Sequence, residues 1–245
     1  MKILDDVYIV GGGEYGIGLS STLDCNIFLV DGGDEIALID CGVGYKPETI
    51  LNNIKSEHVD VSKIKKLFLT HTHLDHSGGA FFFKENLNPE ISLSEKEAKF
   101  LEEGNEEAIG LKIAKDSGLY PSDYCLKPVK VDNILKGWEK IKIGKYELEV
   151  IPTPGHSCGS VCFLLTGHYK RILFAGDTVF QRGLISLQNL PDSSLTDYKI
   201  GINNLKNLNI DCLLPSHFGF ILSKGQSHIN MAIKALNGLA IPKFI

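Results

Sequence analysis

Three histidines and one aspartate fall within six consecutive positions of the chain, in the stretch Thr70-His71-Thr72-His73-Leu74-Asp75-His76-Ser77-Gly78-Gly79. Imidazole is a good ligand for zinc and iron, and a carboxylate can join it as a ligand or bridge two ions. A cluster of this density is hard to explain by packing. The stretch therefore predicts a metal centre.

Three further residues stand in the same local pattern. An apolar strand ends, and small or turn-forming residues follow it beside a His or an Asp. They are His156 in Pro154-Gly155-His156-Ser157, Asp177 in Gly176-Asp177-Thr178, and His217 in Ser216-His217-Phe218-Gly219. The ends of strands in a rigid sheet hold ligands accurately, and loops expose them to solvent and substrate. His58, His168 and His228 are expected to be structural.

Together these stretches supply seven candidate ligands, which exceeds the three or four that one zinc ion takes from a protein. The number suits two metal ions that share one ligand. A carboxylate has two oxygens and can be shared, whereas a neutral imidazole cannot. Asp177 lies alone between the later histidines, so we expect it to be the bridge. Two metal ions about 3.5 to 4 Å apart that share a hydroxide form a standard hydrolytic arrangement.

Short apolar segments separated by turns must position these ligands. We expect strands at about 7–10, 20–30, 35–40, 62–69, 140–143, 147–151, 161–165, 171–175 and 211–215. Tight turns such as Asp31-Gly32-Gly33-Asp34 are typical of an antiparallel or mixed sheet. Gly11 to Gly16 formally matches a dinucleotide-binding fingerprint, but we expect a strand after it and not the helix that such a site requires.

Helices are expected from Pro47 onward, at 80–84, at 94–103, at 105–117 and at about 226–237. Ser94 and Glu97 match a capping box, in which the serine is the N-cap and the glutamate reaches back to it. Phe81, Phe82 and Phe83 are expected to be core residues. The polar segment of about 91–123 is interpreted as a helical insertion, either a lid near the site or a solvated surface element. No repeat or linker divides the chain, so we expect one domain over residues 1–245.

The composition is that of a globular protein, with 43% apolar and 22% charged residues. A net charge of −5 gives no electrostatic reason to expect nucleic acid as a partner. No stretch has the roughly 18 to 20 apolar residues of a membrane span, and the first residues do not resemble a signal peptide. We expect a cytoplasmic protein with a small-molecule substrate; a homo-oligomer stays open.

The six cysteines form no CxxC pair. In a reducing compartment they are expected to be free thiols, mostly buried as small apolar side chains. Cys158 lies two residues after His156, so it is a minor candidate for a ligand.

In order and type, these motifs resemble those of the metallo-β-lactamase superfamily, and the resemblance extends over nearly the whole chain, including Leu38-Ile39-Asp40-Cys41-Gly42. It implies an α/β fold, an αββα sandwich of two mixed β-sheets flanked by helices, with the metal site at one edge between the two halves. It implies that the first metal ion is bound by His71, His73 and His156. The second would be bound by Asp75, His76 and His217, with Asp177 as the bridge.

The resemblance also implies a metal-dependent hydrolase that holds two divalent metal ions, first of all zinc, with iron or manganese as other choices. Metal ions lower the pKa of bound water toward about 7, and the hydroxide that bridges them would attack an ester, thioester, lactone or phosphoester. Asp75 would also orient the nucleophile or handle its proton. Asp75 and Asp177 are therefore the catalytic candidates.

Sequence differences between members of the superfamily narrow the choice of activity for this chain. β-Lactamases of this fold usually lack an aspartate at the position of Asp177, so antibiotic hydrolysis is not expected. The glyoxalase II type has all seven residues but also a helical C-terminal extension, and 28 residues follow His217 here. Quorum-quenching lactonases carry a tyrosine shortly after the bridging aspartate, where this chain has Phe180, with Tyr198 further on. Persulfide dioxygenases resemble the same pattern with one iron, so an iron-dependent oxygenase is the alternative.

Overall fold

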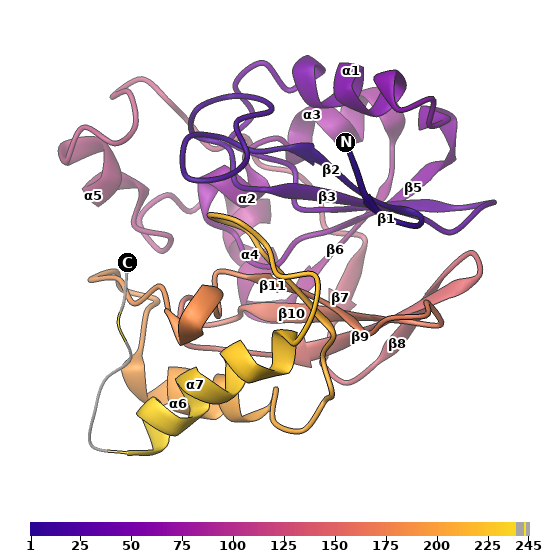
Figure 1. Cartoon of the computed structure of the whole chain (residues 1–245). Coiled ribbons are helices and arrows are strands. Elements are labelled where there is room, and N and C mark those ends of the chain that lie inside the picture. Colours follow the sequence, from indigo (N-terminus) through magenta and orange to yellow (C-terminus); the bar gives the residue numbers. More distant parts are fainter. Residues whose placement is uncertain (239–242, 244–245) are drawn as a thin grey trace.

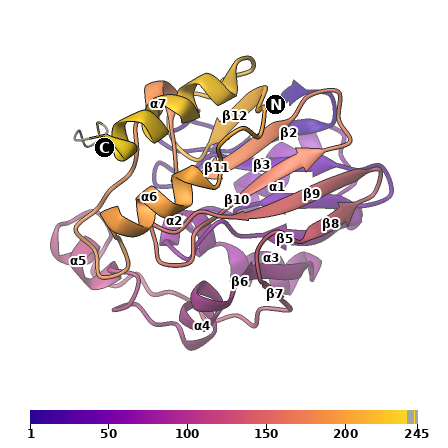
Figure 2. The ribbon, with the colours of Figure 1, turned by 90° about the horizontal axis from the view of Figure 1, so that it is seen from below.

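The computed structural model describes residues 1–238 and Lys243. Two sheets face each other, and helices cover the outer face of each (Figures 1 and 2). This arrangement confirms the predicted αββα sandwich. Residues 239–242 and 244–245, which the expected single domain includes, lie outside the described residues.

The first sheet has seven strands in the order of the chain. They are β1 (Lys2–Leu4), β2 (Val7–Gly11), β3 (Ile27–Asp31), β4 (Ile36–Ile39), β5 (Ile64–Phe68), β6 (Glu90–Ser94) and β7 (Asn133–Leu135). Strands β1 to β4 pair antiparallel, and β4 to β7 pair parallel. The sheet is therefore mixed, as the sequence predicted.

The second sheet has five strands in the order β12-β11-β10-β9-β8. They are β8 (Lys140–Ile143), β9 (Tyr146–Pro152), β10 (Val161–Thr166), β11 (Ile172–Gly176) and β12 (Cys212–Pro215). The pairs are antiparallel except for β11 with β12, which is parallel. Strands β9, β11 and β12 therefore run in the same direction, and their carboxyl ends meet at one edge of the sheet.

Three apolar layers hold the sandwich together, because successive side chains of a strand point to opposite faces of a sheet. Between the sheets, Phe28 packs on Phe174 with ring centroids 5.5 Å apart, and Phe68 packs on Phe163 at 5.4 Å. Full burial of one such side chain stabilises the fold by about 1.5 to 3 kcal/mol. The other two layers lie beneath the helices.

The helices are α1 (Glu48–Ser56), α2 (Leu74–Ser77), α3 (Ala80–Leu87), α4 (Glu95–Glu103), α5 (Leu111–Asp116), α6 (Leu195–Asn203) and α7 (Gly225–Asn237). Two short 3-10 turns lie at Val61–Lys63 and Gln181–Gly183. Residues of α1 and α3, such as Ile54 and Phe83, pack on the outer face of the first sheet. Residues of α6 and α7, such as Tyr198 and Ile229, pack on the outer face of the second.

The expected helical insertion at 91–123 is wrong at its start, because 91–94 belong to strand β6, which pairs with β5. The helix expected at 105–117 is reduced to α5, since Gly110 precedes it with a left-handed φ of 70°. The expected strand at 20–30 is confined to β3. Phe83 is buried, but Phe81 is 37% exposed and is not a core residue.

The capping box at Ser94 and Glu97 is also wrong, although α4 does begin there. Ser94 Oγ donates to the carbonyl of Gly159, and Ser94 makes no side-chain bond to the helix. Glu97 is fully buried and accepts hydrogen bonds from two loops, one after β5 at Thr72 and one after β9 at Ser157. Partners distant in the sequence have replaced the local pair.

The cysteine prediction is confirmed for most of the six. Cys25, Cys41, Cys162 and Cys212 are buried free thiols, whereas Cys158 is half-buried and Cys125 is exposed. In the part of the chain that the structure describes, none of the helices combines the length and the hydropathy that crossing a membrane requires.

Candidate metal centre

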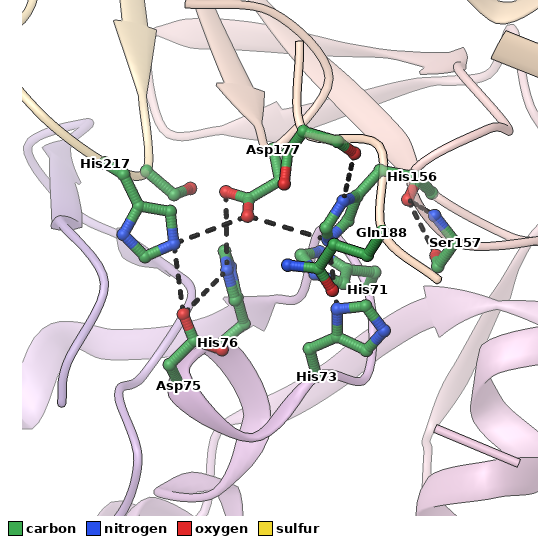
Figure 3. A network of polar contacts seen from close by, with 12 residues as sticks. His71, His73, Asp75, His76, His156, Ser157, Asp177, Gln188 and His217 are labelled. Atoms are coloured by element: carbon green, nitrogen blue, oxygen red, sulfur yellow. Dashed lines mark hydrogen bonds and ion pairs between the residues drawn. The ribbon is translucent and has the colours of Figure 1, made fainter. Parts of the chain in front are cut away.

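All seven predicted ligands lie together at one edge of the sandwich, between the two sheets (Figure 3). His71 and His73 follow β5 of the first sheet, and the one-turn helix α2 carries Asp75 and His76. The other three come from the second sheet, after the carboxyl ends of β9, β11 and β12. They are His156, Asp177 and His217.

A first group consists of His71, His73 and His156, each with one ring nitrogen within 4.8 Å of the others. The other ring nitrogen of each histidine has a protein partner. His71 Nδ1 lies 3.0 Å from Thr70 Oγ1, His73 Nε2 lies 3.2 Å from Asp192 Oδ2, and His156 Nδ1 lies 2.8 Å from the Ser186 carbonyl oxygen. Partners of this kind fix the orientation and tautomer of metal-binding histidines.

These partners decide which ring nitrogens carry lone pairs. The Ser186 carbonyl and the Asp192 carboxylate are acceptors, so His156 Nδ1 and His73 Nε2 donate to them. In neutral rings, His156 Nε2 and His73 Nδ1 are then both acceptors, yet they face each other at 2.9 Å. Burial lowers the pKa of His156 to about 4, which keeps that ring neutral. Burial lowers the pKa of His73, but the Asp192 carboxylate outweighs this and raises it, so a proton on His73 Nδ1 can join the two nitrogens in the metal-free protein. A metal ion would take the place of that proton.

A second group consists of Asp75, His76 and His217. Asp75 Oδ2 lies 3.1 Å from His217 Nε2 and 3.4 Å from His76 Nε2. The outer nitrogen, His76 Nδ1, lies 2.9 Å from Asp40 Oδ2. Burial disfavours the charged form of Asp75, but His76 and His217 outweigh it and hold the pKa of the carboxyl well below its usual range. Asp75 is therefore ionised at neutral pH.

Asp177 lies between the two groups, as Figure 3 shows. Its carboxylate is 3.6 Å from His156 Nε2 of the first group, and 3.3 Å from His217 Nε2 and 3.5 Å from His76 Nε2 of the second. Burial raises the pKa of Asp177, but His217 and His76 outweigh this and hold it well below its usual range. An ionised carboxylate at this place has the geometry that a shared ligand needs.

The donor set fits metal ions. Four polar atoms of the centre are buried and have no hydrogen-bond partner among the described residues: His71 Nε2, His76 Nε2, Asp177 Oδ1 and His217 Nδ1. An unsatisfied buried polar group costs about 1 to 3 kcal/mol, so such atoms are rare in folded proteins. The first three point into the cluster, where metal ions would satisfy them.

Cysteine does not join either group. Cys158, the minor candidate, is in none of the clusters that the described residues form. Cys25 lies near Asp40 and His76, but burial raises the pKa of its thiol far above the usual range, and the Asp40 carboxylate is already bonded. The ligand atoms within reach are therefore imidazole nitrogens and carboxylate oxygens, which suit zinc, iron and manganese.

Three residues that orient the candidate ligands were not predicted from the sequence to do so. Asp40 accepts hydrogen bonds from the backbone N–H of Thr70 at 2.8 Å and from His76, and it does so with a left-handed φ of 62°. Asp192 holds His73. The sequence signal for Asp40 was its place in the Leu38–Gly42 motif, whereas Asp192 lies in an irregular loop without any such signal.

Glu97 is the third of these residues, and it joins the two loops that carry the first group. One carboxylate oxygen accepts from the Thr72 N–H at 3.0 Å. The other accepts from Ser157 Oγ at 2.6 Å and from the Gly159 N–H at 2.9 Å. Thr72 lies between His71 and His73, and Ser157 follows His156, so one buried carboxylate sets the spacing of the two loops.

Tyr198 bonds to the backbone of two loops that border the centre. Its hydroxyl accepts from the Ser186 N–H at 3.2 Å and lies 2.8 Å from the Asp177 carbonyl oxygen, which accepts its proton. The side chain is fully buried. The hydroxyl is therefore occupied by backbone groups and holds the Asp177 and Ser186 loops together.

A cavity of about 370 Å³ opens directly beside the centre and is bordered by Asp75, Asp177 and His217. Its remaining wall comes largely from the segment 109–120, which includes α5. This volume is within the range of small-molecule sites. The segment that the sequence left as either a lid or a solvated element thus lines the cavity.

Residues 21–217 match the family model described as the metallo-beta-lactamase superfamily. The chain is 31% identical over 208 residues to acyl-coenzyme A thioesterase MBLAC2 of Gallus gallus, covering 79% of this chain and 72% of that protein. It is 30% identical over 187 residues to hydroxyacylglutathione hydrolase GloC of Haemophilus influenzae, covering 75% and 80%.

Among solved structures, the metallo-beta-lactamase BJP-1 of Bradyrhizobium japonicum superposes with a TM-score of 0.73. The match covers 96% of this chain and 89% of that one, at 21% identity. Identity at this level supports the fold and not the activity.

Proposed function

Because the chain belongs to the metallo-beta-lactamase superfamily, we propose that it is a hydrolase that uses two divalent metal ions, zinc in the first place, and cleaves thioesters. One observation carries the proposal. Two groups of ligands, His71, His73 and His156 on one side and Asp75, His76 and His217 on the other, lie next to each other with the Asp177 carboxylate between them.

The first group would hold one metal ion, the second group the other, and Asp177 would bind both. Bound there, the ions would supply Lewis acidity, lowering the pKa of water toward about 7 and polarising the substrate carbonyl. The protein's own contribution is to hold the ligands. Asp40, Asp192 and the Ser186 carbonyl keep the outer ring nitrogens protonated, so that the inner nitrogens face the centre as lone pairs.

Asp75 and Asp177 have distinct tasks in this proposal. Asp75 is ionised, borders the cavity and lies 3.1 Å from His217 Nε2, so it can accept a hydrogen bond from the attacking water and orient it. Asp177 is less exposed and stands between the two groups. Its task is to set the separation of the two binding positions.

The two relatives named above favour a thioester as the substrate over an ester, a lactone or a phosphoester. Acyl-coenzyme A thioesterase and hydroxyacylglutathione hydrolase both act on thioesters. Lactone hydrolysis is less favoured because Phe180, and not a tyrosine, stands shortly after Asp177.

Metal analysis together with a substrate panel tests the proposal. Protein purified without added metal should contain two metal ions per chain and should hydrolyse thioesters. Chelation should abolish this activity, and zinc should restore it. One iron per chain, with sulfite formed from a persulfide and oxygen, would replace the hydrolase with the iron-dependent oxygenase.

A further inference from the structure

The cavity beside the metal centre has one polar end and one apolar end. At the polar end are Asp75, Asp177 and His217 of the centre, with Ser186 and Gln188 on a neighbouring loop. Figure 3 shows the Gln188 side chain beside the histidines of the first group. The rest of the lining is mostly hydrocarbon, chiefly Leu23, Ile109, Leu111, Ala114, Leu119 and Leu190. Its polar groups are Thr22, Asp24 and the hydroxyls of Tyr15 and Tyr120.

The apolar end carries no charge that would bind an anionic group. None of the described residues that line the cavity is Lys or Arg. The one acidic residue outside the metal centre, Asp24, uses its oxygens to accept from Ser20 Oγ and from the backbone N–H groups of Ser21 and Val43. A phosphate or carboxylate placed here would lose its hydration without gaining a counter-charge.

The wall is held in place by contacts across the cavity. Gly110 has a left-handed φ of 70°, and a Cβ atom at this position would lie 2.5 Å from Leu190 Cδ2, so the start of α5 is seated directly on the opposite loop. Glu106, which precedes the segment, accepts from the Leu126 N–H at 3.0 Å and pairs with Lys115 near the end of α5 at 2.8 Å, so it ties α5 to the chain on either side of the segment. The apolar end is therefore a formed pocket.

We propose that this pocket binds the acyl chain of the substrate, and that the preferred substrates are thioesters of uncharged acyl groups longer than acetyl. This inference rests on the hydrolase proposed above. With the chain in the pocket, the carbonyl carbon lies at the polar end. The water oxygen bonds to that carbon and the carbon–sulfur bond breaks. The products are a carboxylate, a thiol and one proton.

The pocket also determines where the thiol half of the substrate lies. Because none of the described lining residues is Lys or Arg, a negatively charged thiol carrier has no cationic side chain to pair with at the apolar end and must extend into solvent. We therefore expect the protein to select substrates by the acyl half and to accept different thiol carriers. A phosphodiester carries its charge at the reacting centre and has polar groups on both sides of it. It therefore does not match a cavity that has one apolar end.

The experiment measures kcat/KM for thioesters of one uncharged thiol, N-acetylcysteamine, with acetyl, butanoyl, hexanoyl, octanoyl and decanoyl groups. Each buried methylene should raise kcat/KM about threefold to fourfold until the pocket is full. A profile that is flat or falls from acetyl onward would overturn the acyl pocket. Hydrolysis across the whole series would in that case leave the proposed function standing.

Two variants locate the effect in the pocket. Ala114→Phe fills the cavity from α5 and should lower the ratio of decanoyl to acetyl kcat/KM at least tenfold, roughly the value of two buried methylenes. Leu119→Ala removes apolar wall from a side chain that is 51% exposed, so it should fold, and it should lower the same ratio severalfold. Unchanged ratios in both variants would contradict the assignment.

The matched control is Ile113→Phe, which places the same phenylalanine side chain on the same helix but outside the cavity. Ile113 is 50% exposed and does not line the cavity, so this variant should keep the wild-type profile. If no thioester is hydrolysed, calorimetric titration with decanoate and acetate separates the two proposals. Decanoate binding that Ala114→Phe weakens would keep the pocket and remove the hydrolase, whereas no preference for decanoate would overturn the pocket.

Discussion

Replacing Glu97 by Gln tests whether one buried carboxylate sets the spacing of the first ligand group. Glu97 is fully buried on α4 and accepts three hydrogen bonds, from the Thr72 N–H, the Gly159 N–H and Ser157 Oγ. An amide of nearly the same shape has only one oxygen. Oriented toward Ser157 and Gly159, it keeps two of these bonds and points an N–H group at the Thr72 N–H.

The expected cost follows from the bonds that change. A hydrogen bond to a charged group contributes about 1.5 to 3 kcal/mol, and a buried donor left without an acceptor costs about 1 to 3 kcal/mol. The free energy of unfolding should therefore fall by about 3 kcal/mol, which is a fall in Tm of about 6 to 12 °C for a chain of this size. Because Thr72 lies between His71 and His73, metal affinity should also fall, by about 10-fold to 100-fold.

Thermal unfolding of the metal-loaded and metal-free protein, and competition with a chelator for the metal, measure the two effects. Glu95→Gln is the matched control, because Glu95 is exposed on the same helix and should change stability by about 0.5 kcal/mol at most. If Glu97→Gln loses stability but keeps wild-type metal affinity, the carboxylate supports the fold and does not set the loops. If it differs from the control in neither respect, the reasoning is refuted.

Four further changes test the centre itself. Asp177→Ala should lower both metal content and turnover, and full activity with two bound metal ions would contradict its role as the shared ligand. Asp40→Asn should weaken metal binding about 10-fold to 100-fold in a chelator competition, because His76 Nδ1 loses its carboxylate acceptor; wild-type affinity would exclude this role. Removal of metal should lower Tm, and readdition of metal should restore it. If the free metal concentration was a thousand times its Kd, the free energy of unfolding should fall by about 4 kcal/mol on removal. Equal Tm values with and without metal would mean that the centre holds no metal. In the metal-free protein, burial lowers the pKa of His156 to about 4 while the unfolded ring titrates near 6.5, so the unfolded state binds more protons in this window. Denaturant titrations should therefore show the free energy of unfolding falling from pH 6.5 to pH 4, and His156→Gln should reduce the slope.

The ligands were predictable because each has a local signal. His71 to His76 form a dense motif, and His156, Asp177 and His217 each follow an apolar strand and small or turn-forming residues. The alternation of apolar segments also predicted most strands of both sheets. These features depend on residues near one another in the sequence, which is why a single chain reveals them.

The residues that orient the candidate ligands could not be predicted, because their partners lie far away in the sequence. Asp192 bonds to His73 across 119 positions of the chain, and Glu97 bonds to Ser157 across 60. Locally, Glu97 satisfied the pattern of a capping box, and only the folded arrangement shows that its carboxylate is used elsewhere. The short strand β6 could not be predicted for the same reason, because its parallel partner β5 ends 22 positions before β6 begins.

The split of the ligands between the two sheets has a consequence for how the protein is made. The first four ligands precede residue 77, but the last is His217, and its loop is held by Asn26, whose side chain donates to the carbonyls of Pro215 and Phe218. A growing chain on the ribosome therefore exposes His71 to His76 long before their partners exist. The centre can be completed only after β12 has been synthesised and has joined β11. Assembly of all seven candidate ligands is thus a late step, and a ribosome that stalls before β12 releases a chain with an incomplete set of them.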